Sequence, residues 1–121
     1  MNKIKPWVLA ARPKTLFASL APIIVGISFT FYIYKSIDWM IAILTILSAT
    51  LIQIGSNYAN DAYDYLKGSD DLRIGPQRMA QMGILSPHAI LNMMYFLFII
   101  SVLIGFYLAL VGGWVIVIIG L

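Results

Sequence analysis

The chain contains no cysteine, no glutamate and only one histidine among its 121 residues. The absence of cysteine excludes disulfides, thiolate metal sites and thiol nucleophiles. Charged residues make up only 11% of the chain, against about 25% in an ordinary soluble domain. Hydrophobic residues reach 61%. This apolar excess excludes a soluble globule, a disordered segment and a nucleic-acid binder. The net charge of +3 is therefore interpreted as a feature of a membrane protein and not of a DNA-binding one.

Three long uncharged runs predict membrane-spanning helices at residues 15–34, 39–59 and 89–110. Each run is close to the length of about 20 apolar residues that a helix needs to cross a bilayer. A fourth apolar run begins at residue 114, after a Gly-Gly turn, and is too short to cross. We therefore expect an all-α integral membrane protein with three complete transmembrane helices and the start of a fourth. Because the chain ends inside a hydrophobic run, we expect it to be the front part of a longer protein.

The distribution of Lys and Arg predicts how these helices are oriented. The segments outside the expected helices carry four, one, three and no basic residues in chain order. Basic residues concentrate on the cytoplasmic side of membrane proteins. We therefore expect the N-terminus and the loop at residues 60–88 to lie in the cytoplasm, and the protein to lie in the cytoplasmic (inner) membrane.

A polar patch follows the second run. At about 100° per residue, one helical face carries Gln53, Asn57, Asn60, Asp61 and Asp64. Two further acids, Asp70 and Asp71, come within the next few residues. Clustered carboxylates repel one another unless a cation lies between them, and oxygen ligands without thiol or imidazole suit Mg²⁺ or Mn²⁺. The alternative is that these residues are simply a helix end that reaches the lipid headgroups.

The loop that follows the patch is basic as well as acidic. Lys67, Arg73 and Arg78 are interleaved with the acids. Such cations can neutralise a diphosphate, and arginine can contact it with two parallel hydrogen bonds. The alternative is that they are ordinary cytoplasmic positive charges. The mixture of both signs in one loop favours a site that binds a phosphorylated substrate through a metal ion.

Three stretches, at residues 7–16, 57–70 and 73–78, resemble the UbiA-type family of intramembrane aromatic prenyltransferases. Within this family they are most similar to the branch that prenylates 1,4-dihydroxy-2-naphthoate in menaquinone synthesis. The resemblance implies the front part of a nine-helix bundle with two Asp-rich motifs, of which this chain carries the first. It implies Mg²⁺ as cofactor, with polyprenyl diphosphate and an aromatic acceptor as substrates. It also implies that the missing C-terminal half is needed for a complete site.

The resemblance assigns roles to individual residues. Asp61 and Asp64 match the catalytic, metal-binding carboxylates, and Asp70 is the candidate for a third metal ligand. Substrate binding is implied for a further set of residues, namely Asn57, Asn60, Lys67, Arg73 and Arg78.

Three other functions fit parts of the pattern. The acceptor could instead be of the 4-hydroxybenzoate type. The acidic face could belong to a cation transporter, although the neighbouring basic cluster speaks against a cation pathway. The short fourth run could mark a truncated membrane protein without catalytic activity.

Overall fold

The computed structural model describes residues 3–66 and 84–120. Lys67, Asp70, Arg73 and Arg78 lie outside these described residues. Six helical elements make up the described part, namely α1 (Lys5–Ala11), the 3₁₀ helix η1 (Pro13–Thr15), α2 (Leu16–Tyr34), α3 (Trp39–Leu66), α4 (Pro87–Gly112) and α5 (Trp114–Gly120). Three helical segments, 5–34, 39–66 and 87–112, are long and apolar enough to cross a membrane. The expected all-α membrane architecture is confirmed.

Helix α3 is longer than the run that predicted it. The expected loop begins at residue 60, whereas the helix continues to Leu66. The helix continues because residues 60–66 contain neither Gly nor Pro, the residues that most often end a helix. After residue 60, the first Gly or Pro in the sequence is Gly68. A helix of 28 residues is about 42 Å long, against about 30 Å for the hydrocarbon core. About eight residues of α3 therefore extend to headgroup level, so polar side chains are tolerated there.

Helix α4 begins and ends at residues that suit helix ends. Pro87 occupies the first turn of α4 behind an extended Ser86, and a proline at this position loses no hydrogen bond. Gly113 has a φ of 88° and separates α4 from α5. This backbone conformation favours glycine because it has no Cβ.

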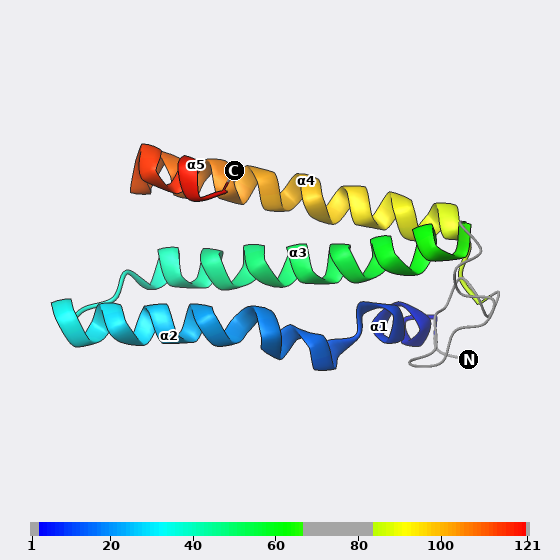
Figure 1. The fold of residues 1–121 in the computed structure, drawn as a ribbon, viewed down its shortest axis with the longest axis horizontal. Coiled ribbons are helices and arrows are strands. Elements are labelled where there is room, and N and C mark those ends of the chain that lie inside the picture. Colours follow the sequence, from blue (N-terminus) through cyan, green and yellow to red (C-terminus); the bar gives the residue numbers. More distant parts are fainter. Residues whose placement is uncertain (1–2, 67–83, 121) are drawn as a thin grey trace.

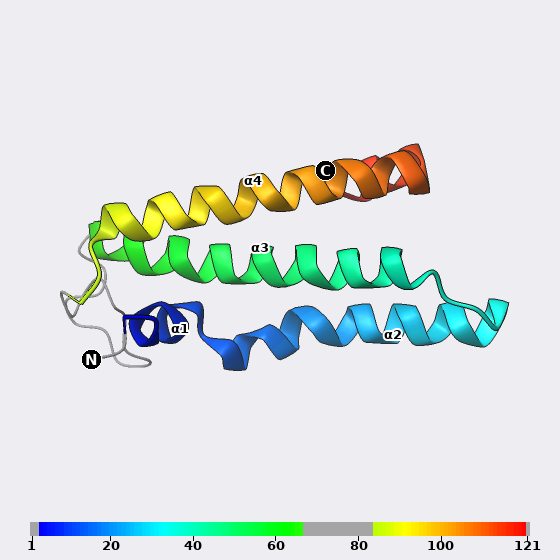
Figure 2. The same ribbon diagram turned by 180° about the vertical axis from the view of Figure 1, so that it is seen from behind.

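Helix α3 lies in the middle of the molecule. Figure 1 shows α2 on one side of it and α4 on the other, with the short α1 beside the C-terminal end of α3. Figure 2 shows the same order from behind. Buried apolar residues concentrate where α1, α3 and α4 meet, namely Ala10, Ala11, Tyr58, Ala62, Ile90 and Met94. Helix α2, by contrast, has no buried residue.

Close approach of α3 and α4 depends on Gly55. A Cβ added to Gly55 would lie 2.5 Å from Cε1 of Phe98, which is too close for two carbon atoms. We expect Gly55→Ala to destabilise the packing of α3 against α4 by about 1–3 kcal/mol, because overfilling a packed site forces side chains and backbone to shift. The measurement is the free energy of unfolding in detergent micelles, from titration with a denaturing detergent.

Gly26→Ala is the matched control, since nothing lies within 4 Å of the added Cβ. It should leave stability unchanged or raise it slightly, because alanine favours helix. The double variant Gly55→Ala/Phe98→Leu should recover part of the loss. Equal stabilities of the two alanine variants would contradict the close packing of Phe98 on Gly55.

Candidate functional site

The polar face of α3 passes from the membrane interior to the end of the helix. Gln53, Asn57, Asp61 and Asp64 follow one another at spacings of four, four and three residues. Asn57 is 4% exposed and Asp61 is 1% exposed. Asp64 is half-buried, and Asn60 is exposed. The predicted residues of this face therefore lie on one helix, but their environments differ.

Asn57 is held by the last residue of α1 and by η1. Its Nδ2 donates a hydrogen bond of 2.7 Å to the carbonyl oxygen of Ala11 and one of 2.8 Å to Oγ1 of Thr15. Thr15 Oγ1 in turn donates to the carbonyl oxygen of Arg12, at 2.8 Å. Both amide hydrogens of Asn57 are thus used within the protein. This side chain fastens the start of the chain to α3, a role that the sequence pattern did not suggest.

Gln53 extends this polar contact one turn along α3. Its Oε1 accepts a hydrogen bond of 2.5 Å from Oγ of Ser19, on α2. Its Nε2 makes longer contacts, 3.4 Å to Oγ1 of Thr15 and 3.5 Å to Oδ1 of Asn57. The hydroxyls of Thr15 and Ser19, which are four residues apart, therefore contact side-chain amides of α3 that are also four residues apart. From the sequence, no role was assigned to Thr15 or Ser19. The equal spacing of the two hydroxyls and the two amides was the one pattern that could have predicted their contact.

Helix α1 covers the same end of α3. The hydroxyl of Tyr58 donates to the carbonyl oxygen of Trp7 at 3.0 Å, and the two rings meet edge to face at 5.6 Å between centroids. Ala10 and Ala62 are almost completely buried in the cluster beside them. The small side chains of Ala10 and Ala62 let α1 approach α3 closely. Asp61, one residue before Ala62, is buried at the same end of α3.

A carboxylate pair with helical spacing remains as the metal-binding candidate. Asp61 and Asp64 are three residues apart, so their side chains are neighbours on the helix surface. Among residues 3–66 and 84–120, no group of three His, Cys, Asp or Glu side chains could hold a metal ion. Two carboxylates nevertheless fit Mg²⁺, which is usually bound by one or two carboxylates together with substrate phosphates. The proposed third ligand, Asp70, lies outside the described residues.

Two tyrosine hydroxyls meet near this end of the bundle. The hydroxyl oxygens of Tyr63 on α3 and Tyr95 on α4 are 3.3 Å apart. Both side chains are substantially exposed. The pair therefore adds a polar link between α3 and α4 at the end of α3 that carries the acids.

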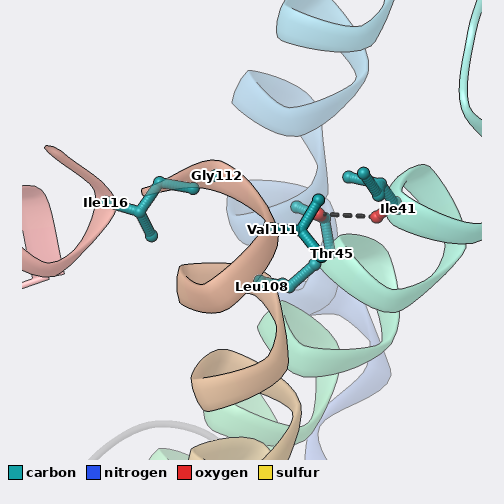
Figure 3. Close-up of a pocket in the computed structure, with 6 residues that line it drawn as sticks. All are labelled: Ile41, Thr45, Leu108, Val111, Gly112 and Ile116. Carbon is teal, nitrogen blue, oxygen red and sulfur yellow. Dashed lines mark hydrogen bonds between the residues drawn. The ribbon is translucent and has the colours of Figure 1, made fainter. Parts of the chain in front are cut away.

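An apolar pocket of about 230 Å³ lies at the other end of α3, between α3, α4 and α5. Figure 3 shows its lining residues, which are Ile41, Thr45, Leu108, Val111, Gly112 and Ile116. The hydroxyl of Thr45 donates to the carbonyl oxygen of Ile41 at 2.8 Å. No charged side chain lines this pocket. The acidic end of α3 therefore remains the candidate site, and this pocket lies at the opposite end of the helix.

The family model of the UbiA prenyltransferases matches residues 19–121. The chain belongs to the UbiA prenyltransferase family. It is 33% identical over 117 residues to a 1,4-dihydroxy-2-naphthoate octaprenyltransferase of Mycobacterium tuberculosis, covering 96% of this chain and 40% of that protein. It is 40% identical over 87 residues to the protein of the same name from Escherichia coli, covering 71% of this chain and 28% of that protein.

A third relative of the same name, from Bacillus subtilis, is 29% identical over 116 residues, which is 95% of this chain and 37% of that protein. The chain thus spans at most about 40% of the length of these three curated relatives. No solved structure matches it significantly.

Asn57→Leu should destabilise the fold by about 1–3 kcal/mol, because the carbonyl of Ala11 and the hydroxyl of Thr15 lose a buried hydrogen-bond donor. The measurement is again detergent unfolding. Asn60→Leu makes the same chemical change three residues away at an exposed position. It should alter stability by less than about 0.5 kcal/mol. If both variants lost the same stability, Asn57 would not be the fastening residue.

Proposed function

We propose that the complete protein transfers a polyprenyl group from polyprenyl diphosphate to 1,4-dihydroxy-2-naphthoate, in menaquinone synthesis. The observation that carries this proposal is the buried carboxylate of Asp61 at the headgroup end of a membrane helix, in a chain of the prenyltransferase family. Ionisable groups at such positions are expensive and mark functional sites. The names of the relatives supply the acceptor.

The residues of the site suit the departure of a diphosphate. Asp61 and Asp64 would hold Mg²⁺, which would stabilise the negative charge that develops on the departing diphosphate. Lys67, Arg73 and Arg78 would contact the same diphosphate as cations. A membrane site suits this substrate because the polyprenyl tail is soluble in lipid.

The proposed reaction needs no nucleophilic side chain. The allylic C–O bond breaks, and the diphosphate leaves with the electron pair. An electron-rich carbon of the naphthoate ring then forms the new C–C bond. The ring regains its aromatic state by losing its carboxylate as CO₂. This chemistry agrees with a chain that has no cysteine.

We also propose that the acidic end of α3 faces the cytoplasm of a cell whose cytoplasmic membrane holds the protein. The support is the distribution of basic residues, because the α2–α3 connection carries only Lys35, whereas three basic residues lie between α3 and α4 in the sequence. Water-soluble dihydroxynaphthoate and magnesium would then reach the site from the same side.

The first experiment is an assay of prenyl transfer by the natural full-length gene product in isolated membranes. We expect transfer to 1,4-dihydroxy-2-naphthoate that stops when Mg²⁺ is chelated. Asp64→Asn should lower turnover at least about 100-fold, because a group that stabilises charge in the transition state is lost.

Asp38→Asn is the matched control for that variant. Asp38 accepts hydrogen bonds from the backbone N–H groups of Met40 and Ile41 at the start of α3, far from the acidic end, and an amide oxygen can replace it. The Asp38→Asn variant should therefore keep the turnover of the unmodified protein. Normal activity of Asp64→Asn in saturating Mg²⁺ would remove Asp64 from the site, and transfer to 4-hydroxybenzoate in place of dihydroxynaphthoate would overturn the acceptor.

Single cysteines can test the orientation, since these 121 residues contribute no cysteine of their own. Ser36→Cys and Ser86→Cys lie at exposed positions at opposite ends of the bundle. In intact cells, a membrane-impermeant maleimide should label Ser36→Cys alone. Ser86→Cys should react only after the cells are permeabilised. The reverse pattern would invert the proposed orientation.

A further inference from the structure

The backbone turns sharply at Arg12, between α1 and η1. Arg12 has φ 53° and ψ 70°, the left-handed conformation that residues with a Cβ rarely adopt. Such strain persists where surrounding contacts enforce it, and it concentrates at functional sites. Arg12 ends α1 and donates its backbone N–H to the carbonyl oxygen of Leu9, and Lys35 ends α2 in the same way with a hydrogen bond to Phe31. What distinguishes Arg12 is that side-chain hydrogen bonds from α3 hold the backbone around it.

Side chains from α3 hold the backbone on both sides of Arg12. On one side, Asn57 donates to the carbonyl oxygen of Ala11. On the other side, Asn57 and Gln53 both donate to Oγ1 of Thr15, and Thr15 donates to the carbonyl oxygen of Arg12 itself. We call Thr15, Gln53 and Asn57 the amide clamp. The clamp sets the place and direction of Arg12 relative to α3.

The clamp holds Arg12 close to the acidic end of α3. Asn57, which contacts the residue before Arg12, is four residues from Asp61, and side chains at this spacing on a helix are neighbours, about 5–6 Å apart at Cβ. The guanidinium Nη2 of Arg12 is buried, whereas the side chain of Lys14, two residues later, is exposed. Of these two cations, Arg12 is the one whose charge is directed into the protein.

We propose that Arg12 contacts the phosphate oxygens of the substrate beside Asp61, and that Thr15, Gln53 and Asn57 act as its positioning residues. The guanidinium suits this role, since its planar fork matches two phosphate oxygens and keeps its charge when buried. The left-handed turn then becomes useful, because it fixes the direction of the Cα–Cβ bond from which this long side chain starts. This inference rests on the proposed prenyl-diphosphate site.

The test compares Michaelis constants in the natural full-length product. Arg12→Gln should raise the KM for prenyl diphosphate, and the inhibition constant of inorganic pyrophosphate, about tenfold or more. The KM for the aromatic acceptor should stay unchanged. Lys14→Gln removes the same charge at an exposed neighbour and should change none of these constants.

The clamp is tested with Thr15→Val, which has nearly the same shape without the hydroxyl. It should raise the same two constants about threefold or more, and Thr15→Ser should restore them. Thr50→Val is the control, because Thr50 bonds only within α3, to the carbonyl oxygen of Ile46. If Thr15→Val lowered only the amount of folded protein, with KM unchanged, the clamp would be structural and the positioning role would be wrong.

Binding of labelled pyrophosphate separates this inference from the proposed function. If the natural product transfers no prenyl group, the proposed function fails, yet Arg12→Gln should still weaken pyrophosphate binding relative to Lys14→Gln. If both variants bind pyrophosphate equally, or the natural protein binds none, the inference is overturned. A lipid phosphate is the other source of this chemistry. In that case Arg12→Gln would alter the binding of short-chain phosphatidylglycerol to the detergent-solubilised protein, with both pyrophosphate constants unchanged, and this too would overturn it.

Discussion

The hydrogen bond between Asn57 and the carbonyl of Ala11 is the contact on which the arrangement of the acidic end depends. It joins residues 46 positions apart and connects α3 to the last residue of α1. Thr15 and Gln53 support it from either side. Without this connection, α1 would keep the hydrogen bond from Tyr58 to Trp7 and its apolar contacts with α3. With it, the cover over Asp61 and the turn at Arg12 have fixed positions.

The membrane explains why these contacts are polar while the surroundings are apolar. A hydrophobic driving force between helices is weak in lipid, so packing of small residues and hydrogen bonds between helices hold a bundle together. The contact of Gly55 with Phe98 is a small-residue packing contact between α3 and α4. The hydrogen bond between Gln53 and Ser19 connects α3 to α2. The middle helix therefore carries both the contacts that hold its neighbours and the acids of the candidate site.

The sequence predicted the fold class well because its signal is strong and local. Uncharged runs of about 20 residues leave few alternatives to membrane helices, and the structure has three such helices. The end of the second helix was harder to predict. The expected span ended at residue 59 and the polar segment after it was assigned to the cytoplasmic loop, although helical periodicity continued to Asp64. The helix runs on to Leu66 because this segment lacks the Gly or Pro that would end a helix. Helical periodicity placed Asn57, Asp61 and Asp64 on one face, and the structure has them on one helix.

What the sequence determined by itself is the membrane location, the helices and the acidic face of α3, because each depends on neighbours within a few residues. What only the tertiary structure decided is how the members of that face differ. Asn57 holds the turn at Arg12, whereas Asn60 is exposed. The two asparagines share a residue type and a motif, and only the approach of α1 and η1 from far along the chain distinguishes them. Long-range contacts of this kind leave no local periodicity from which they could be predicted.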